Sequence, residues 1–163
     1  MKWILFLVSH TLCVLAGFAA GIYALPILIQ PDSLDISVIS KSSQGVLYQG
    51  TFDRNRTDSD FLHWGEGEIW LTEDTIAFQG ELAPGPDYKV YLSPTFVETE
   101  ADFNRLKLQM INVGDVKTFD RFMVTLPQDL PLDNYTTVII WCETFGEFIT
   151  SAQLESVANL NQS

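Results

Sequence analysis

The sequence has few of the residues that metal centres and many enzymes require. Its 163 residues include two histidines and two cysteines, and His63 is the one histidine outside the N-terminal apolar run. A zinc site of the His-Glu-x-x-His type needs two histidines, and c-type haem attachment needs Cys-x-x-Cys-His, so the sequence fits neither. It also lacks a Cys-x-x-Cys pair, a Gly-x-Ser-x-Gly elbow and a phosphate-binding glycine-rich loop. With no hydrolase or nucleotide-binding motif, we do not expect a stand-alone enzyme.

Positive charge is also scarce. The chain has nine lysines and arginines against 21 acidic residues, which gives a net charge of −12 at pH 7. Such a surface repels nucleic acid and anionic lipid, both of which attract basic patches. We therefore expect no nucleic-acid partner and interpret the acidic residues as a solvated surface.

Charge is missing altogether from Trp3 to Ile29. About 20 apolar residues cross a bilayer core, whereas the apolar part of a cleaved signal peptide has about 7–15. We predict that residues 1–29 form a transmembrane anchor, or an uncleaved signal, with residues 3–29 in contact with membrane lipid. Because Lys2 precedes the run and positive charge stays inside, we place the N-terminus in the cytoplasm. The remaining domain is then periplasmic, extracellular or lumenal.

The rest of the chain shows the polar–apolar alternation that indicates β-strands. Residues 66–72 and 75–79 flank the polar pair Glu73-Asp74, which predicts a β-hairpin. The unbroken apolar run of residues 138–142 predicts a strand that is covered on both faces.

Short strands at regular spacing predict an all-β fold. We expect an antiparallel β-sandwich or barrel-like domain of about seven to nine strands, preceded by one N-terminal transmembrane helix. We assign residues 30–44 to a stalk or linker, residues 45–155 to the β domain and residues 156–163 to a C-terminal tail. No stretch after Ile29 shows helical periodicity of useful length, and we expect residues 94–102 to form an acidic loop.

Several motifs, taken in order, resemble the DM13 domain family over about residues 45–155. They are Gly50-Thr51-Phe52, His63 followed by Gly67, Phe78 with Gly85-Pro86-Asp87 and Val90-Tyr91-Leu92-Ser93, and Ile140-Trp141-Cys142 with Phe145, Phe148 and Ala152-Gln153-Leu154. The resemblance implies a β-sandwich-like fold and a role in electron transfer or another redox process. It also implies that this role uses the family's cysteine, which matches Cys142. The sequence departs from the family at residues 149–151, where we expect a Phe-Gly pair.

Cys142 has two interpretations on sequence alone. It is either a small buried residue at the end of a core strand, or a redox thiol that ligates a cofactor or exchanges disulfides. Cys13 lies in the apolar run, so an intact anchor keeps the two cysteines apart. His63 is the only imidazole available to Cys142, which makes these two residues the candidate metal ligands. We add Trp141 to them as a candidate cofactor-binding residue, for a haem or a transition metal.

Strand alternation orders the residues around Cys142. Val138, Ile140 and Cys142 should share one face of the strand, with Ile139 and Trp141 on the other. Two functions follow. The first is a membrane-anchored extracytoplasmic redox module that uses Cys142 and serves a redox partner. The alternative is a non-catalytic extracytoplasmic protein-binding or adhesion module in which Cys142 is structural.

Overall fold

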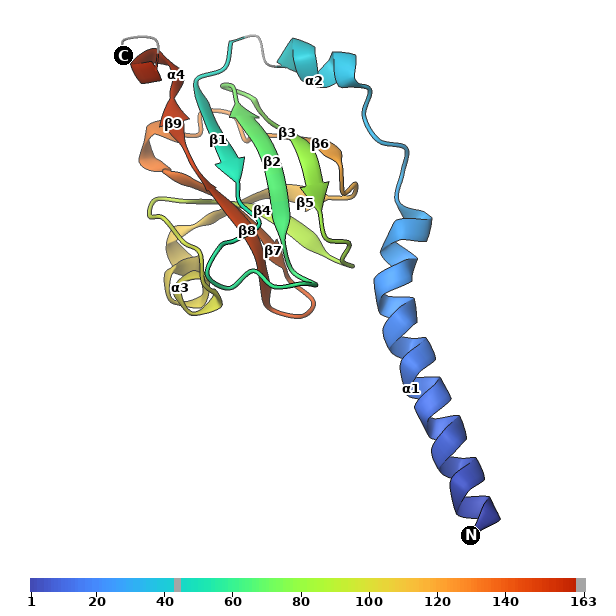
Figure 1. Cartoon of the computed structure of the whole chain (residues 1–163). Coiled ribbons are helices and arrows are strands. Elements are labelled where there is room, and N and C mark those ends of the chain that lie inside the picture. Colours follow the sequence, from blue (N-terminus) through green and yellow to red (C-terminus); the bar gives the residue numbers. More distant parts are fainter. Residues whose placement is uncertain (43–44, 161–163) are drawn as a thin grey trace.

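The computed structural model describes residues 1–42 and 45–160, and Figure 1 shows a long helix followed by a two-layered β domain. Helix α1 (Lys2–Ile29) leads through the short helix α2 (Ile36–Ser42) into that domain. Residues 43–44 and 161–163, at the ends of the predicted stalk and tail, lie outside the described residues.

The β domain consists of two antiparallel sheets. The first sheet has the order β6 (Arg121–Thr125), β3 (Thr75–Leu82), β2 (Gly65–Leu71), β1 (Tyr48–Phe52) and β9 (Glu155–Ser156). The second has the order β5 (Ile111–Val116), β4 (Tyr88–Ser93), β7 (Thr137–Cys142) and β8 (Glu147–Gln153). Within the part of the chain that the structure describes, these nine strands confirm the predicted sandwich, and the sheets do not close into a barrel. The predicted hairpin is strands β2 and β3, which pair from Gly65 with Leu82 to Leu71 with Ile76.

Strand β7 is buried along its whole length, as its apolar run predicts. Val138, Ile140 and Cys142 belong to the core between the two sheets. Ile139 and Trp141 belong to a second core on the outer side of the second sheet. The predicted division of this strand into two faces is therefore confirmed.

The second core is covered by helix α3 (Glu100–Leu106) and the 3₁₀ turn η1 (Lys107–Gln109). Phe103 and Leu106 of the helix are buried against Ile139 and Trp141. The expectation of an acidic loop over residues 94–102 was wrong for residues 100–102, which form the first turn of α3. Thr99 accepts a hydrogen bond of 3.1 Å from the backbone of residue 102, an N-cap that starts the helix.

The segment between α1 and β1 packs against the first sheet. Helix α2 lies beside β3 and buries Ile39, and the Ser33 hydroxyl donates a hydrogen bond to Asp120. At the other end of the chain, β9 adds to the edge of β1 and is followed by the short helix α4 (Val157–Leu160). Part of the predicted stalk and part of the predicted tail are therefore ordered against the domain.

Helix α1 has 28 residues and is long and apolar enough to cross a membrane. Pro26 is the one buried residue of this helix, which indicates that most of the helix makes no contact with the β domain. Figure 1 shows its N-terminal half extending well beyond the domain.

Candidate functional site

Cys142 lines a pocket of about 330 Å³ at one end of the sandwich. The pocket forms where the loop between β1 and β2, the loop between β3 and β4 and the turn after β7 meet helix α1. From the domain, His63, Tyr88 and Phe145 line it together with Cys142, and Tyr23 lines it from α1. We refer to this cavity as the Cys142 pocket.

The ladder between β4 and β7 fixes the position of Cys142. Tyr88 lies directly opposite Cys142, and residues opposite each other in an antiparallel pair share one face of the sheet. The backbone N–H of Glu143 donates to the carbonyl of Asp87 at 3.0 Å, and that of Gly146 donates to the carbonyl of Cys142 at 2.9 Å. Gly146 has a φ of 71°, which glycine adopts without strain. The backbone around Cys142 is therefore fixed by hydrogen bonds, and with it the direction in which the thiol points.

The Cys142 thiol is shielded from water. Cys142 is 3% exposed and is in no disulfide. Burial raises the pKa of the thiol above its ordinary value of 9.0, and hydrogen bonds from backbone groups, Phe145 first, offset only part of that rise. A reactive thiolate needs a nearby cation, and neither lysine nor arginine is among the residues that line the pocket. At neutral pH the pocket therefore holds a protonated thiol.

His63 enters the pocket from a loop that Asp60 organises. The Asp60 carboxylate accepts hydrogen bonds of 2.7 Å from the backbone N–H groups of Leu62 and His63, and its second oxygen lies 3.3 Å from His63 Nδ1. Burial raises the pKa of Asp60, but these hydrogen bonds outweigh it and hold the pKa below its ordinary value. The aspartate thus fixes the imidazole, whose side chain is 30% exposed, at the edge of the pocket.

Tyr88 forms a wall of the pocket and packs on the loop before β4. Burial raises the pKa of Tyr88 far above its ordinary value of 10.0, with a smaller contribution from Cys142. A Cβ atom at Gly85 would lie 2.3 to 2.5 Å from atoms of the Tyr88 ring. Position 85 therefore requires glycine for the ring to lie where it does.

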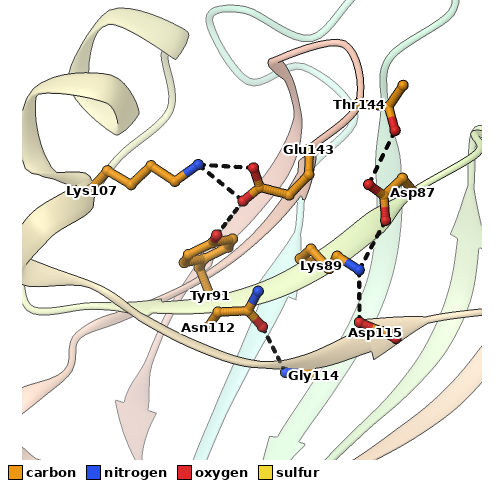
Figure 2. Close-up of polar contacts among 9 residues, drawn as sticks. All are labelled: Asp87, Lys89, Tyr91, Lys107, Asn112, Gly114, Asp115, Glu143 and Thr144. Atoms are coloured by element: carbon orange, nitrogen blue, oxygen red, sulfur yellow. Dashed lines mark hydrogen bonds and ion pairs between the residues drawn. The ribbon is translucent and has the colours of Figure 1, made fainter.

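The outer face of β4 and the turn after β7 carry a polar network (Figure 2). Tyr91 donates a hydrogen bond to the Glu143 carboxylate, which also accepts two from Lys107 Nζ, at 3.0 and 2.9 Å. Burial raises the pKa of Glu143, but the hydrogen bonds from Tyr91 and Lys107 outweigh it and lower the pKa. Burial and then the hydrogen bond to Glu143 raise the pKa of Tyr91 to about 12.

A second group of charges continues this network along the same face (Figure 2). Lys89 Nζ lies 2.9 Å from carboxylate oxygens of both Asp87 and Asp115. Thr144 donates a hydrogen bond of 3.1 Å to Asp87. These contacts join β4, β5 and the turn that follows Cys142, so they support the pocket from its outer side.

Trp141 lies away from the Cys142 pocket. Its ring stacks on Phe103 with centroids 3.8 Å apart and an interplanar angle of 9°. Lys107 Nζ lies 5.9 Å from the centroid of the Trp141 ring and 5.4 Å from that of Phe103. Of the three residues singled out from the sequence, the structure brings His63 and Cys142 to one pocket and places Trp141 on the opposite side of the sheet.

The pocket offers few ligands for a metal ion. Among the residues that the structure describes, no group of three His, Cys, Asp or Glu side chains is placed to hold one. Cys142 and His63 supply two ligands, whereas a tetrahedral zinc site takes three or four from the protein. A haem needs one or two axial ligands, and thiolate and imidazole are both among those that serve. The haem or transition-metal cofactor remains a prediction from the sequence.

Sequence reasoning did not assign Tyr88 to the site, and it named Gly85, Pro86 and Phe145 only as parts of the family motifs. Strand alternation places Tyr88 on the same face as Val90 and Leu92, so the sequence pattern could have predicted that its side chain points into the core. Its position opposite Cys142 depends on the pairing of β4 with β7, which are distant in the chain. No local pattern carries that pairing.

Comparison of the chain with curated proteins and with solved structures found no significant match. A family model described as electron transfer DM13 matches residues 56–154. This range begins in the loop that carries His63 and ends just after β8, so it includes Cys142 and the domain residues that line its pocket, but not those of α1. The motifs that suggested the resemblance lie mostly within it. The chain belongs to the DM13 family.

Proposed function

We propose that this protein is an electron-transfer module, anchored in a membrane by α1, with its domain outside the cytoplasm and Cys142 as its redox-active group. Membership of a family described as electron transfer supports the general role. The observation that carries the proposal is the pocket that Cys142 and His63 both line. It joins the domain's only cysteine to its only imidazole.

The protonated state of Cys142 determines the chemistry that we propose. Loss of one electron to a one-electron oxidant, such as the oxidised metal centre of a partner protein, must be accompanied by loss of the thiol proton. The S–H bond breaks, the sulfur keeps one electron as a thiyl radical, and the proton passes through the imidazole of His63 to solvent. Asp60 holds the imidazole in place for this transfer, because its carboxylate lies 3.3 Å from Nδ1. Return of the electron reverses each of these changes.

The test is voltammetry of the purified full-length protein over a range of pH. Coupling of one proton to one electron predicts a midpoint potential that falls by about 59 mV per pH unit. The Cys142→Ala variant should lose the signal and remain folded, and His63→Gln should keep the signal with altered proton coupling. A wild-type protein with no signal would refute the redox role. Metal analysis and the visible absorption spectrum of the same sample test the cofactor prediction.

The alternative is a protein-binding or adhesion module with a structural cysteine, and one observation favours it. Cys142 is almost completely buried in the intersheet core, and its thiol pKa is raised rather than lowered. Free cysteines in such places commonly fill volume. A thiol that resists alkylation until the domain unfolds, in a protein that is colourless and electrochemically silent, would support this alternative.

The proposed anchoring has its own test. Lys2 and the uncharged run after it suggest an N-terminus in the cytoplasm. Protease added to intact cells or spheroplasts should then remove the domain from Gly45 onward. A domain that is digested only after the membrane is lysed would contradict the proposed orientation.

A further inference from the structure

Large apolar side chains are exposed at the end of the sandwich where the Cys142 pocket opens. Phe61, in the loop between β1 and β2, is 83% exposed, and Phe145, in the turn between β7 and β8, is 51% exposed. Leu62 is exposed beside them and, like Phe145, lines the pocket. The two loops therefore present one apolar tip, which we define as Phe61, Leu62 and Phe145. Helix α1 also presents an apolar surface, because its apolar side chains are exposed along its length.

The apolar tip lies level with a particular part of α1. Ala19, Ile22 and Tyr23 line the same pocket as Leu62 and Phe145, so the two loops face this helix near residues 19–23. In Figure 1 the helix continues from there beyond the end of the sandwich, toward its own N-terminus. The part of α1 that extends past the domain thus begins near Tyr23.

The length of that extending part matches a bilayer. Trp3 and Tyr23 are separated by 20 residues, which correspond to about 30 Å of helix at 1.5 Å per residue. The hydrocarbon core of a bilayer is about 30 Å thick, and Trp and Tyr gather at its two interfaces. Cys13 stands halfway between the two aromatic residues. A span from Trp3 to Tyr23 places the apolar tip at the outer interface.

We infer that this end of the domain rests on the membrane that α1 spans, with Phe61, Leu62 and Phe145 inserted at the boundary between headgroups and acyl chains. The inference depends on the proposed anchoring and adds a second, non-helical contact with lipid. Zwitterionic lipid is the matching surface, because the chain carries a net charge of −12. The Cys142 pocket then opens at the bilayer surface.

Depth-dependent fluorescence quenching of the full-length protein in phosphatidylcholine nanodiscs tests this placement. An environment-sensitive fluorophore is attached to one cysteine at a time in a Cys142→Ala background. The positions are the native Cys13 and, in chains that also carry Cys13→Ser, Phe61→Cys, Phe145→Cys and Leu47→Cys. Leu47 precedes β1, so it lies at the opposite end of that strand from the loop that carries Phe61. Nitroxide-labelled lipids then quench the fluorophore from the headgroup region or from the bilayer centre.

We expect the label at Cys13 to be quenched best from the bilayer centre. Labels at positions 61 and 145 should lose about half their emission to the quencher in the headgroup region, because the tip is expected to insert by about 5–10 Å. The label at position 47 should lose almost none. If Cys13 is quenched but positions 61 and 145 behave like position 47, the inference is overturned while the anchoring stands. If Cys13 is not quenched either, the anchoring fails and the inference fails with it. Circular dichroism of each variant confirms that it is folded before labelling.

Discussion

The two faces of strand β7 show how one strand can carry two kinds of environment. Its inner face, toward the other sheet, ends in Cys142, a buried thiol beside an apolar pocket with no cation among its lining residues. Its outer face, under α3, carries Trp141 in an aromatic stack that Lys107 and Glu143 border. One face shields a neutral polar atom, and the other surrounds an aromatic ring with paired charges.

The inner face of β7 is therefore suited to chemistry, and the outer face is suited to stability. On the outer face, every charge in the Tyr91–Glu143–Lys107 group has a partner, so the group resists change. On the inner face, Cys142 has backbone partners and an adjacent pocket, so a change in its protonation or redox state affects few other groups. The comparison predicts that mutations on the outer face alter stability alone, whereas those on the inner face alter function as well as stability.

The largest loss of stability should come from Trp141→Ala. Trp141 is 2% exposed and stacks on Phe103, so its removal leaves a cavity beneath α3. Large-to-small substitutions of this kind cost about 3–5 kcal/mol. Urea unfolding of the purified protein measures the loss. Trp141→Phe is the matched control and should lose less, because it keeps an aromatic ring and removes an indole N–H that has no hydrogen-bond partner within the described residues. Equal losses for the two variants would contradict the importance of the stack.

Gly85→Ala tests the inner face with a single added methyl group. The new Cβ would meet the Tyr88 ring at 2.3 to 2.5 Å, so the ring or the loop must move. Overpacking of this kind costs about 1–3 kcal/mol. A Tyr88→Leu substitution in the same chain should remove much of that cost, since the overlap is with the ring. Unfolding free energies of the two single variants and the double variant measure this coupling, and strictly additive losses would contradict the contact.

The features of β7 that depend on a local sequence pattern could be predicted from the sequence. The run Val138 to Cys142 predicted a buried strand and the residues on each of its faces, because side chains alternate at every second position. Helix α3 was missed, although Thr99 followed three residues later by Asp102 is the spacing of an N-cap. Its seven residues are too few to show a clear helical period.

The site was less predictable than the fold because it is assembled from distant segments. His63 could be named from the sequence, since the domain has no other imidazole. Its place at the Cys142 pocket depends on the loop between β1 and β2, which Asp60 shapes, and on the packing of the two sheets. The contribution of Tyr23 depends on where α1 lies against the domain. These long-range relations leave no periodic signal.

Cys142→Ala should cost about 1–2 kcal/mol, because it removes one buried atom from the core. The cost should depend on pH. A thiol whose pKa is raised in the folded state stabilises the fold fully below its ordinary value of 9.0 and loses that contribution as the pH rises through the folded value. The difference in stability between wild type and variant should therefore shrink above about pH 9. A difference that stays constant from pH 7 to pH 10.5 would mean that the thiol is not shielded as described.

The smallest change in stability should come from Glu143→Gln on the outer face. The carboxylate is partly exposed and pairs with Lys107, and such pairs contribute about 0.2–1 kcal/mol. The substitution keeps the size of the side chain but removes the charge that accepts hydrogen bonds from Tyr91 and Lys107. Lys107→Met is the matched control, because it removes the cation and leaves the carboxylate beside Tyr91.

The sharper measurement on these two variants is the ionisation of Tyr91, followed by ultraviolet absorbance. Burial is the first cause of its pKa of about 12, and the hydrogen bond to Glu143 is the second. Glu143→Gln should therefore lower the pKa of Tyr91 toward 10.0 without reaching it, whereas Lys107→Met should not lower it. Because the pKa of Tyr91 is raised in the folded state, its contribution to stability is complete below pH 10 and is lost as the pH rises toward 12. Glu143→Gln should make that loss smaller. If Tyr91 titrates at the same pH in wild type and Glu143→Gln, the carboxylate does not control the tyrosine, and burial alone raises its pKa.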